Sequence, residues 1–170
     1  MITVMTITAI SYLIFVSSGF VHEGGHSVVG NWVGIEIAGF SPAKCLRLDC
    51  KVYPLESLEG WQGNTVLFAG GITASLWWLA IYLVTTPWHR KGGWLIGGIT
   101  AALIAGELTT GIFEGGWNWF YSNYQVLTLI MIVITMVAGF FVQLRFASQT
   151  FRVHLFIQGI RSNLGPDREL

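Results

Sequence analysis

The chain has 170 residues, of which 53% are hydrophobic and 11% charged, and its nine basic and nine acidic residues give a formal net charge of zero. This composition excludes an intrinsically disordered chain and argues against a water-soluble domain, and zero net charge offers no basic surface for nucleic acid. The length suffices for one domain. We expect an all-α integral membrane protein with about four transmembrane helices.

The first apolar segment covers residues 3–33 and exceeds the roughly 20 helical residues that cross a bilayer. No basic region precedes it and it is long for a leader, so we expect no cleavable signal peptide. Its second half contains the stretch "GFVHEGGHSVVG", in which His22, Glu23 and His26 are titratable residues inside an apolar segment.

The loop 34–60 is predicted to form a short β-hairpin at the membrane surface. Its stretches "GIEIAGF" and "CLRLDCKVYPL" alternate apolar and polar residues on either side of a "SPAK" turn. Cys45 and Cys50 lie in the second stretch. They would form a lasting disulfide if the loop faces an oxidising compartment, and two free thiols are the alternative.

Three further apolar segments, 62–86, 93–116 and 124–146, are each long enough to span a bilayer. Tryptophan prefers the headgroup layer, and six of the eight lie at segment ends: Trp32, Trp61, Trp88, Trp94, Trp117 and Trp119. We therefore expect a transmembrane domain over 1–147. Apolar residues recur at helical spacing beyond it, which predicts an interfacial amphipathic helix and a polar tail within 148–170.

The distribution of Lys and Arg predicts the orientation. These residues are more numerous around residues 90–91 and after residue 144 than in the loop 34–60. Because cytoplasmic loops are enriched in positive charge, both termini are expected in the cytoplasm and the loop 34–60 outside. The expected location is the cell membrane of a prokaryote, with the lipid bilayer as the chain's surroundings.

The spanning segments contain three acidic residues, Glu23, Glu107 and Glu114, and no Lys or Arg away from their ends. A charge inside a bilayer costs at least about 2.5–3.5 kcal/mol on insertion scales. Three carboxyls and two imidazoles without an internal cation therefore indicate a bound metal ion. The alternative is a hydrogen-bonded polar cluster that holds the helices together.

The spacing of the two histidines also favours a bound metal ion. His22 and His26 are four residues apart, so they project from one helix face, as in the H-E-x-x-H arrangement that binds zinc. Zinc usually takes a third protein ligand. Glu114 is the preferred candidate, because the two glycines after it would let the backbone open beside a metal. Glu107 would then support the site or be a protonated carboxyl, and the reverse assignment stays open.

"HEGGHSVVG" in a transmembrane helix resembles the site-2 protease family of intramembrane zinc metallopeptidases. The stretch "AGGITAS" is similar to the family's Gly-Pro-x-x-Asn motif, with Gly71 and Ser75 at the matching ends and Ile72 in place of proline. "FEGG" is similar to its Leu-Asp-Gly motif, with Glu114 at the aspartate position. The resemblance covers roughly residues 8–120 and also implies a hairpin after the first helix.

This resemblance implies an intramembrane zinc-dependent endopeptidase that cleaves transmembrane or membrane-adjacent peptides. His22, His26 and Glu114 would hold Zn²⁺, and Glu23 would act as general base toward the attacking water. Gly71 and Ser75 would line a slot for an unwound substrate strand. Asn118 would either contact this site, orienting Glu114 or substrate, or cap a helix end.

The alternative function is a non-catalytic, metal-binding scaffold subunit of a larger membrane complex. The altered second motif and the lack of an inserted peptide-binding domain favour it. Glu23 argues against it, because a purely structural metal site needs no general base. The substrate, or the partner subunits in the alternative, would in either case be membrane proteins or peptides.

Overall fold

The computed structural model describes residues 2–38, 40–47, 50–54, 58, 60–90 and 94–163. Its elements in chain order are α1 (Ile2–Val33), β1 (Ile37–Ala38), α2 (Pro42–Cys45), β2 (Tyr53–Pro54), α3 (Gly60–Arg90), α4 (Trp94–Gly111), the π-helical turn η1 (Ile112–Gly116), α5 (Asn118–Asn123) and α6 (Gln125–Asn163). The described chain is thus almost entirely helical, as predicted.

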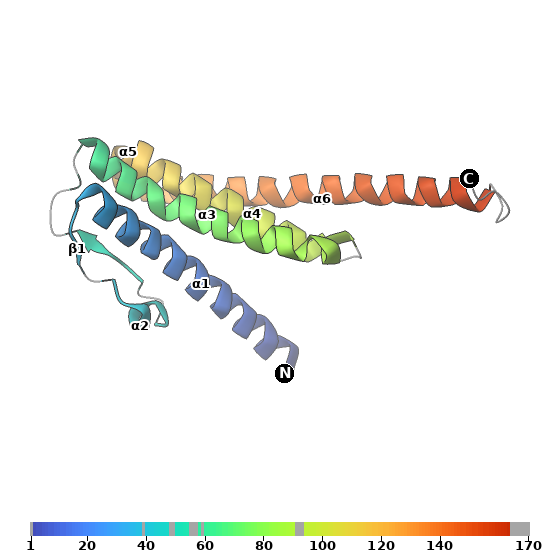
Figure 1. The fold of residues 1–170 in the computed structure, drawn as a ribbon, viewed down its shortest axis with the longest axis horizontal. Helices are drawn as coiled ribbons and strands as arrows, with labels where there is room; N and C mark the ends of the chain where they lie inside the picture. The colour runs from blue at the N-terminus through green and yellow to red at the C-terminus, as the bar shows by residue number, and fades with distance from the viewer. Residues whose placement is uncertain are drawn as a thin grey trace.

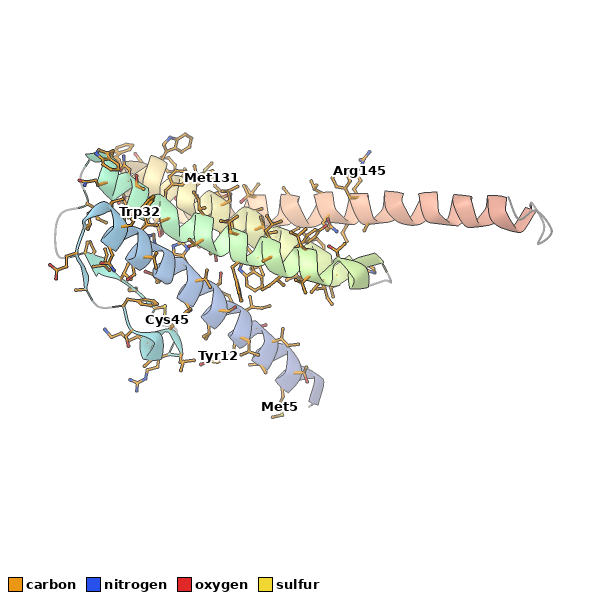
Figure 2. All side chains as sticks on the ribbon, in the orientation of Figure 1. Met5, Tyr12, Trp32, Cys45, Met131 and Arg145 are labelled. Carbon is orange, nitrogen blue, oxygen red and sulfur yellow. A yellow bond between two sulfur atoms is a disulfide. The ribbon has the colours of Figure 1, made fainter. Side chains whose placement is uncertain are left out.

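Three helical stretches of the described chain are long and apolar enough to cross a membrane: Gly60–Thr86, Trp94–Gly116 and Gln125–Ala147. They coincide closely with three of the four predicted segments. The remaining predicted segment forms α1, and its role as a fourth span stays a prediction. Exposed apolar side chains line α1 from Met5 near one end to Trp32 near the other (Figure 2).

The long helices pack side by side in the order α1, α3, α4, α6 (Figure 1). Small residues bring them together. A Cβ on Gly71 of α3 would lie 2.4 Å from the carbonyl oxygen of Glu107 on α4, and a Cβ on Gly139 of α6 would lie 2.9 Å from the carbonyl oxygen of Ala101. Glycine at these positions lets the backbones approach closely, which is how membrane helices commonly associate.

The stretch 148–163 is helical but does not form a separate helix. It continues α6, whose 39 residues reach about 58 Å at 1.5 Å per residue. In Figure 1 this helix extends well beyond the ends of α3 and α4. The predicted helix is therefore part of α6 and not a separate element, and its place at the membrane interface stays a prediction. The predicted polar tail, residues 165–170, lies outside the described residues.

Helix α1 ends at a glycine. Gly34 has a φ of +84°, a conformation that L side chains rarely adopt. The N–H of Ile35 then donates to the carbonyl oxygen of Gly30 at 2.9 Å, which satisfies one of the last free carbonyls of the helix. The chain turns here and returns along the side of α1 that faces away from α3 (Figure 1).

The hairpin predicted for 34–60 is not confirmed. Among the described residues only a two-residue antiparallel pair forms, with Ile37 opposite Pro54 and Ala38 opposite Tyr53. Helix α2 occupies the predicted turn, because Pro42 at its first position fixes a helical φ. Between the two strands, Cys45 and Cys50 form a disulfide bond.

Side-chain contacts hold this loop against α1. The rings of Phe20 and Phe40 lie 5.5 Å apart, and the hydroxyl of Tyr12 donates to the carbonyl oxygen of Leu46. Near β2, the backbone N–H of Val52 donates to a carboxylate oxygen of Glu23 at 2.9 Å. The loop therefore covers the polar part of α1 from the side opposite α3.

Candidate metal centre

The two histidines of "HEGGH" are buried on one face of α1. His22 is 8% exposed and His26 is 6% exposed, and their ring centroids lie 4.8 Å apart. Gly25 between them faces α3, where a Cβ would lie 2.0 Å from Oγ1 of Thr73 and 2.8 Å from the carbonyl oxygen of Ala69. A glycine there lets α1 approach α3 closely enough to bury both imidazoles.

Each imidazole is held through its Nδ1 atom. Nδ1 of His26 lies 2.6 Å from the carbonyl oxygen of Val66, which can only accept a hydrogen bond. Nδ1 of His22 lies 2.9 Å from Oε2 of Glu107, and a carboxylate likewise accepts. With hydrogen on both Nδ1 atoms, the neutral rings present the lone pair of Nε2, the form in which histidine binds metals.

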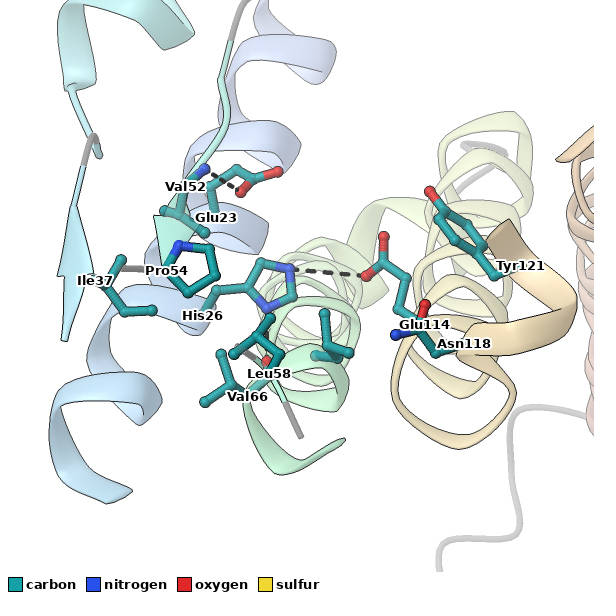
Figure 3. Close-up of a pocket in the computed structure, with 11 residues that line it drawn as sticks. Glu23, His26, Ile37, Val52, Pro54, Leu58, Val66, Glu114, Asn118 and Tyr121 are labelled. Carbon is teal, nitrogen blue, oxygen red and sulfur yellow. Dashed lines mark hydrogen bonds and ion pairs between the residues drawn. The ribbon is translucent and has the colours of Figure 1, made fainter. Parts of the chain in front are cut away.

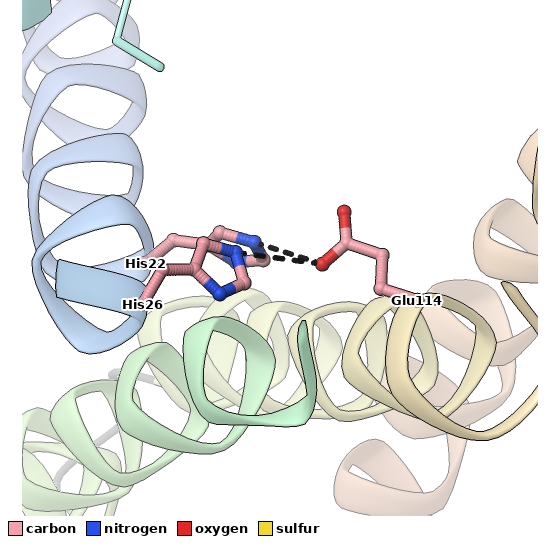
Figure 4. Close-up of side chains that lie close together, drawn as sticks. All are labelled: His22, His26 and Glu114. Atoms are coloured by element: carbon pink, nitrogen blue, oxygen red, sulfur yellow. Dashed lines mark hydrogen bonds and ion pairs between the residues drawn. The ribbon is translucent and has the colours of Figure 1, made fainter. Parts of the chain in front are cut away.

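Glu114 completes the group (Figure 4). Its Oε2 lies 3.2 Å from Nε2 of His22 and 3.7 Å from Nε2 of His26. One ligand atom from each of the three residues lies within 4.8 Å of the others. A tetrahedral zinc with ligands at about 2.0–2.2 Å separates its ligand atoms by about 3.3–3.6 Å, so the spacing suits zinc.

The excess of hydrogen-bond acceptors over donors at this point also fits a bound cation. Two Nε2 lone pairs and a carboxylate oxygen converge, and all three are acceptors when both Nδ1 atoms carry hydrogen. A proton can bridge one pair of these atoms, whereas a metal ion satisfies all three. The residues present therefore fit zinc, since two imidazoles and one carboxylate are a typical catalytic zinc set.

Gly70 on α3 lies directly against the Nε2 atoms of the two histidines. A Cβ there would lie 2.4 Å from Nε2 of His26 and 2.7 Å from Nε2 of His22, in the space to which both lone pairs point. Sequence reasoning selected its neighbour Gly71 instead. The only signal for Gly70 was the glycine pair in "AGGITAS", and the rotation of α3 decides which of the two faces the histidines.

Glu114 lies in the π-helical turn η1. The N–H of Trp117 donates to the carbonyl oxygens of Ile112 and Phe113, both at 3.2 Å, so the turn is wider than an α-helical one. Such turns are frequent at functional sites. Within it, Gly115 packs against α3, where a Cβ would lie 2.7 Å from the backbone nitrogen of Phe68. The backbone thus departs from the α-helix between Ile112 and Gly116, a stretch that includes Glu114 and the two glycines after it.

Glu107 lies behind His22 rather than beside the Nε2 atoms. Its Oε2 faces Nδ1 of His22, and its Oε1 accepts a hydrogen bond from Oγ of Ser18. Ser18 in turn accepts from Nε1 of Trp78 at 3.1 Å. Of the two arrangements left open by the sequence, the geometry matches the one with Glu114 as ligand and Glu107 as support. Sequence reasoning identified neither Ser18 nor Trp78, which have no motif.

A cavity of about 140 Å³ opens beside these residues (Figure 3). Its polar lining is Glu23, His26, Glu114, Asn118 and Tyr121. Its remaining lining is apolar and comes from the loop and from α3: Ile37, Val52, Pro54, Leu58, Val66 and Leu67. The cavity therefore combines polar groups with an apolar lining.

Glu23 and Tyr121 face this cavity from different elements. One oxygen of Glu23 is held by the N–H of Val52, and the other is directed away from that bond (Figure 3). Tyr121 extends from α5 beside Glu114. Its burial, the negative charges of Glu114 and Glu23, and a hydrogen bond to Glu114 raise the pKa of its hydroxyl. The phenol therefore stays protonated and able to donate. No motif in the sequence marks Tyr121.

Of the three residues expected to line a substrate slot, only one lies at the cavity. Asn118 lines the cavity, as expected for a residue near Glu114. Gly71 is buried against α4, and Oγ of Ser75 donates to the carbonyl oxygen of Gly71 at 2.7 Å. These two residues lie in the contact between α3 and α4, so the structure does not bring them to the cavity.

Comparisons with family models, curated proteins and solved structures gave no match to this chain. The resemblance to site-2 proteases therefore rests on the motifs and on the geometry of the residues that they bring together.

Proposed function

We propose that this protein is an intramembrane zinc-dependent endopeptidase of the site-2 protease type, with α1 as a fourth span and both termini in the cytoplasm. The observation that carries the proposal is the convergence of His22, His26 and Glu114 beside a cavity that Glu23 also lines. Glu107 and Glu114 belong to the apolar stretch Trp94–Gly116, which suits a site at membrane depth.

Zinc, when bound, would act as a Lewis acid that polarises the scissile carbonyl and activates water. The chain's own residues supply the other parts. Val52 fixes one oxygen of Glu23, so the other is oriented to take a proton from the attacking water and pass it to the leaving amine nitrogen. Glu107 and the carbonyl of Val66 hold the two imidazoles in the metal-binding tautomer.

The substrate class follows from the cavity's surroundings. Six apolar residues line the cavity beside its polar groups, and the site lies next to membrane-spanning helices. An extended apolar peptide fits this space better than a charged one, since burying an unpaired charge is costly. We therefore propose a transmembrane or membrane-adjacent peptide as substrate.

One observation favours the second candidate, a non-catalytic metal-binding scaffold subunit. Gly71 and Ser75, at the positions that resemble the family's second motif, are used in packing α3 on α4 and leave no substrate slot there. The partner of such a subunit would be another membrane protein.

The variant Glu23→Gln separates the two candidates. It keeps the size of the side chain and the acceptor for Val52 but removes the base, so zinc content should be unchanged. A peptidase should lose cleavage by about 10²–10⁴-fold, measured on membrane peptides in detergent micelles. Cleavage that persists at the wild-type rate in the zinc-loaded variant would contradict the assigned role of Glu23.

A further inference from the structure

Two polar side chains approach the cavity from opposite walls. Glu23 comes from α1 and is held by Val52 of the loop, whereas Tyr121 comes from α5 (Figure 3). His26 and Glu114 lie between them. A peptide carbonyl placed beside these two metal-ligand candidates would thus have a base on one side and a phenol on the other.

Hydrolysis of a peptide needs a group at each of these positions. The base removes a proton from water, and a hydrogen-bond donor stabilises the negative charge that develops on the carbonyl oxygen. Most described donors at the cavity are already engaged. The N–H of Val52 donates to Glu23, and Nδ1 of His26 donates to Val66. The side chains of Asn118 and Tyr121 are the remaining donors, and the hydroxyl of Tyr121 hydrogen-bonds the carboxylate of Glu114 in this structure.

Tyr121 is the better placed of the two. Asn118 is exposed, and its Oδ1 accepts a hydrogen bond from Ser122 at 3.1 Å, which turns the amide along α5. Tyr121 is partly buried and interacts with both Glu114 and Glu23. Its ring is rigid, and the contact between Phe113 and Phe120, with ring centroids 5.7 Å apart, holds α5 against η1.

We propose that Tyr121 is a catalytic residue whose hydroxyl donates a hydrogen bond to the oxygen of the scissile carbonyl as negative charge develops there. This inference rests on the proposed peptidase function. The water oxygen bonds to the carbonyl carbon and the carbon–nitrogen bond breaks. The water's proton passes through Glu23 to the leaving nitrogen, and Tyr121 keeps its own proton throughout.

The substitution Tyr121→Phe tests the role because it removes only the hydroxyl. Loss of one such donor lowers kcat by about 10²–10³-fold, while KM should change little. Zinc content should equal that of wild type, because the ring still packs beside Glu114. Tyr124→Phe is the matched control, since the ring of Tyr124 lies 5.1 Å from that of Phe120, next to Tyr121 in sequence, but does not line the cavity. It should match wild type in kcat and zinc content.

A binding measurement gives a readout that does not depend on turnover. A phosphinic peptide with leucine on both sides mimics the tetrahedral carbon and carries a negative oxygen where Tyr121 would donate. Zinc-loaded Tyr121→Phe should bind it at least about tenfold more weakly than wild type, because transition-state analogues report such contacts. Tyr124→Phe should bind it as wild type does.

The outcomes are distinguishable. Unchanged kcat and unchanged phosphinic affinity in Tyr121→Phe would overturn the role of Tyr121 and leave the proposed function standing. Loss of zinc from this variant would also overturn it, because the hydroxyl would then support Glu114 rather than the substrate. If wild-type protein binds neither zinc nor the phosphinic peptide, the proposed function itself fails, and this inference fails with it.

Discussion

At the scale of single residues, Glu107 of α4 and Glu114 of η1 lie on different sides of the same histidine, His22. Glu114 faces Nε2 of His22 at 3.2 Å, whereas Glu107 faces Nδ1 of His22 at 2.9 Å. The other oxygen of Glu107 accepts a hydrogen bond from Ser18. One carboxylate is therefore placed to bind a metal directly, and the other to orient the ring that binds it. This difference in position predicts a difference in the effect of removing each charge.

We expect Glu114→Gln to lose zinc during purification, because a ligand is replaced by a neutral amide. Glu107→Gln should weaken zinc binding by about 10–100-fold, as is usual for groups that orient a ligand, and should still load with added zinc. Chelator competition on the two purified variants measures both affinities. If Glu107→Gln loses zinc and Glu114→Gln keeps it, the two acids have exchanged roles.

At the scale of elements, the site depends on how closely α3 approaches α1. Gly70 brings the α3 backbone under the two imidazoles, and Gly25 allows α1 to meet Thr73. The space between the two Nε2 atoms and α3, where a metal would bind, is therefore bounded by the α3 backbone. A single methyl group at Gly70 is enough to fill it.

We expect Gly70→Ala to reduce zinc binding strongly while the helices still form, since alanine has the higher helix propensity. The added Cβ would lie 2.4 Å from Nε2 of His26, so the ring must move. Gly24→Ala is the control within "HEGGH", because its Cβ would meet only Cζ of Phe40 at 3.8 Å. Zinc titration and circular dichroism compare the two, and equal zinc affinity would contradict the close approach at Gly70.

The elements also show which features could be predicted from sequence. The spacing of His22 and His26 is local to one helix, so their common face follows from helical periodicity alone. Glu114 could be chosen from the glycines after it, which belong to the π-helical turn Ile112–Gly116. These inferences needed no knowledge of how the helices pack.

Features that depend on packing between elements could not be predicted. Gly70 rather than Gly71 faces the histidines because α3 is rotated to place Gly71 against α4. Tyr121 reaches the cavity because the π-helical turn redirects the chain into α5. The alternating pattern of the loop suggested a longer hairpin, but the described loop folds over α1 through α2 and a disulfide.

At the scale of the whole molecule, the loop and α5 lie at one end, and α6 extends beyond the opposite end (Figure 1). The extended part of α6 carries Arg152 and Arg161, and α3 ends at Arg90. The excess of positive charge at this end favours a cytoplasmic position for both termini. The disulfide at the other end suits an oxidising compartment.

We therefore expect thiol labelling of intact cells with a membrane-impermeant maleimide to reach Cys45 and Cys50 once they are reduced. A cysteine introduced by Arg90→Cys, with Cys45 and Cys50 replaced by serine, should be labelled only after the membrane is permeabilised. The opposite labelling pattern would reverse the proposed orientation, although it would leave the metal centre unaffected.

The zinc content of the purified wild-type chain tests the central claim most directly. Elemental analysis of protein prepared in detergent without chelator should find about one zinc per chain, because two histidines and one carboxylate form a single site. His22→Ala and His26→Ala should each lose it. Wild-type protein that is free of metal and binds no added zinc would contradict the account.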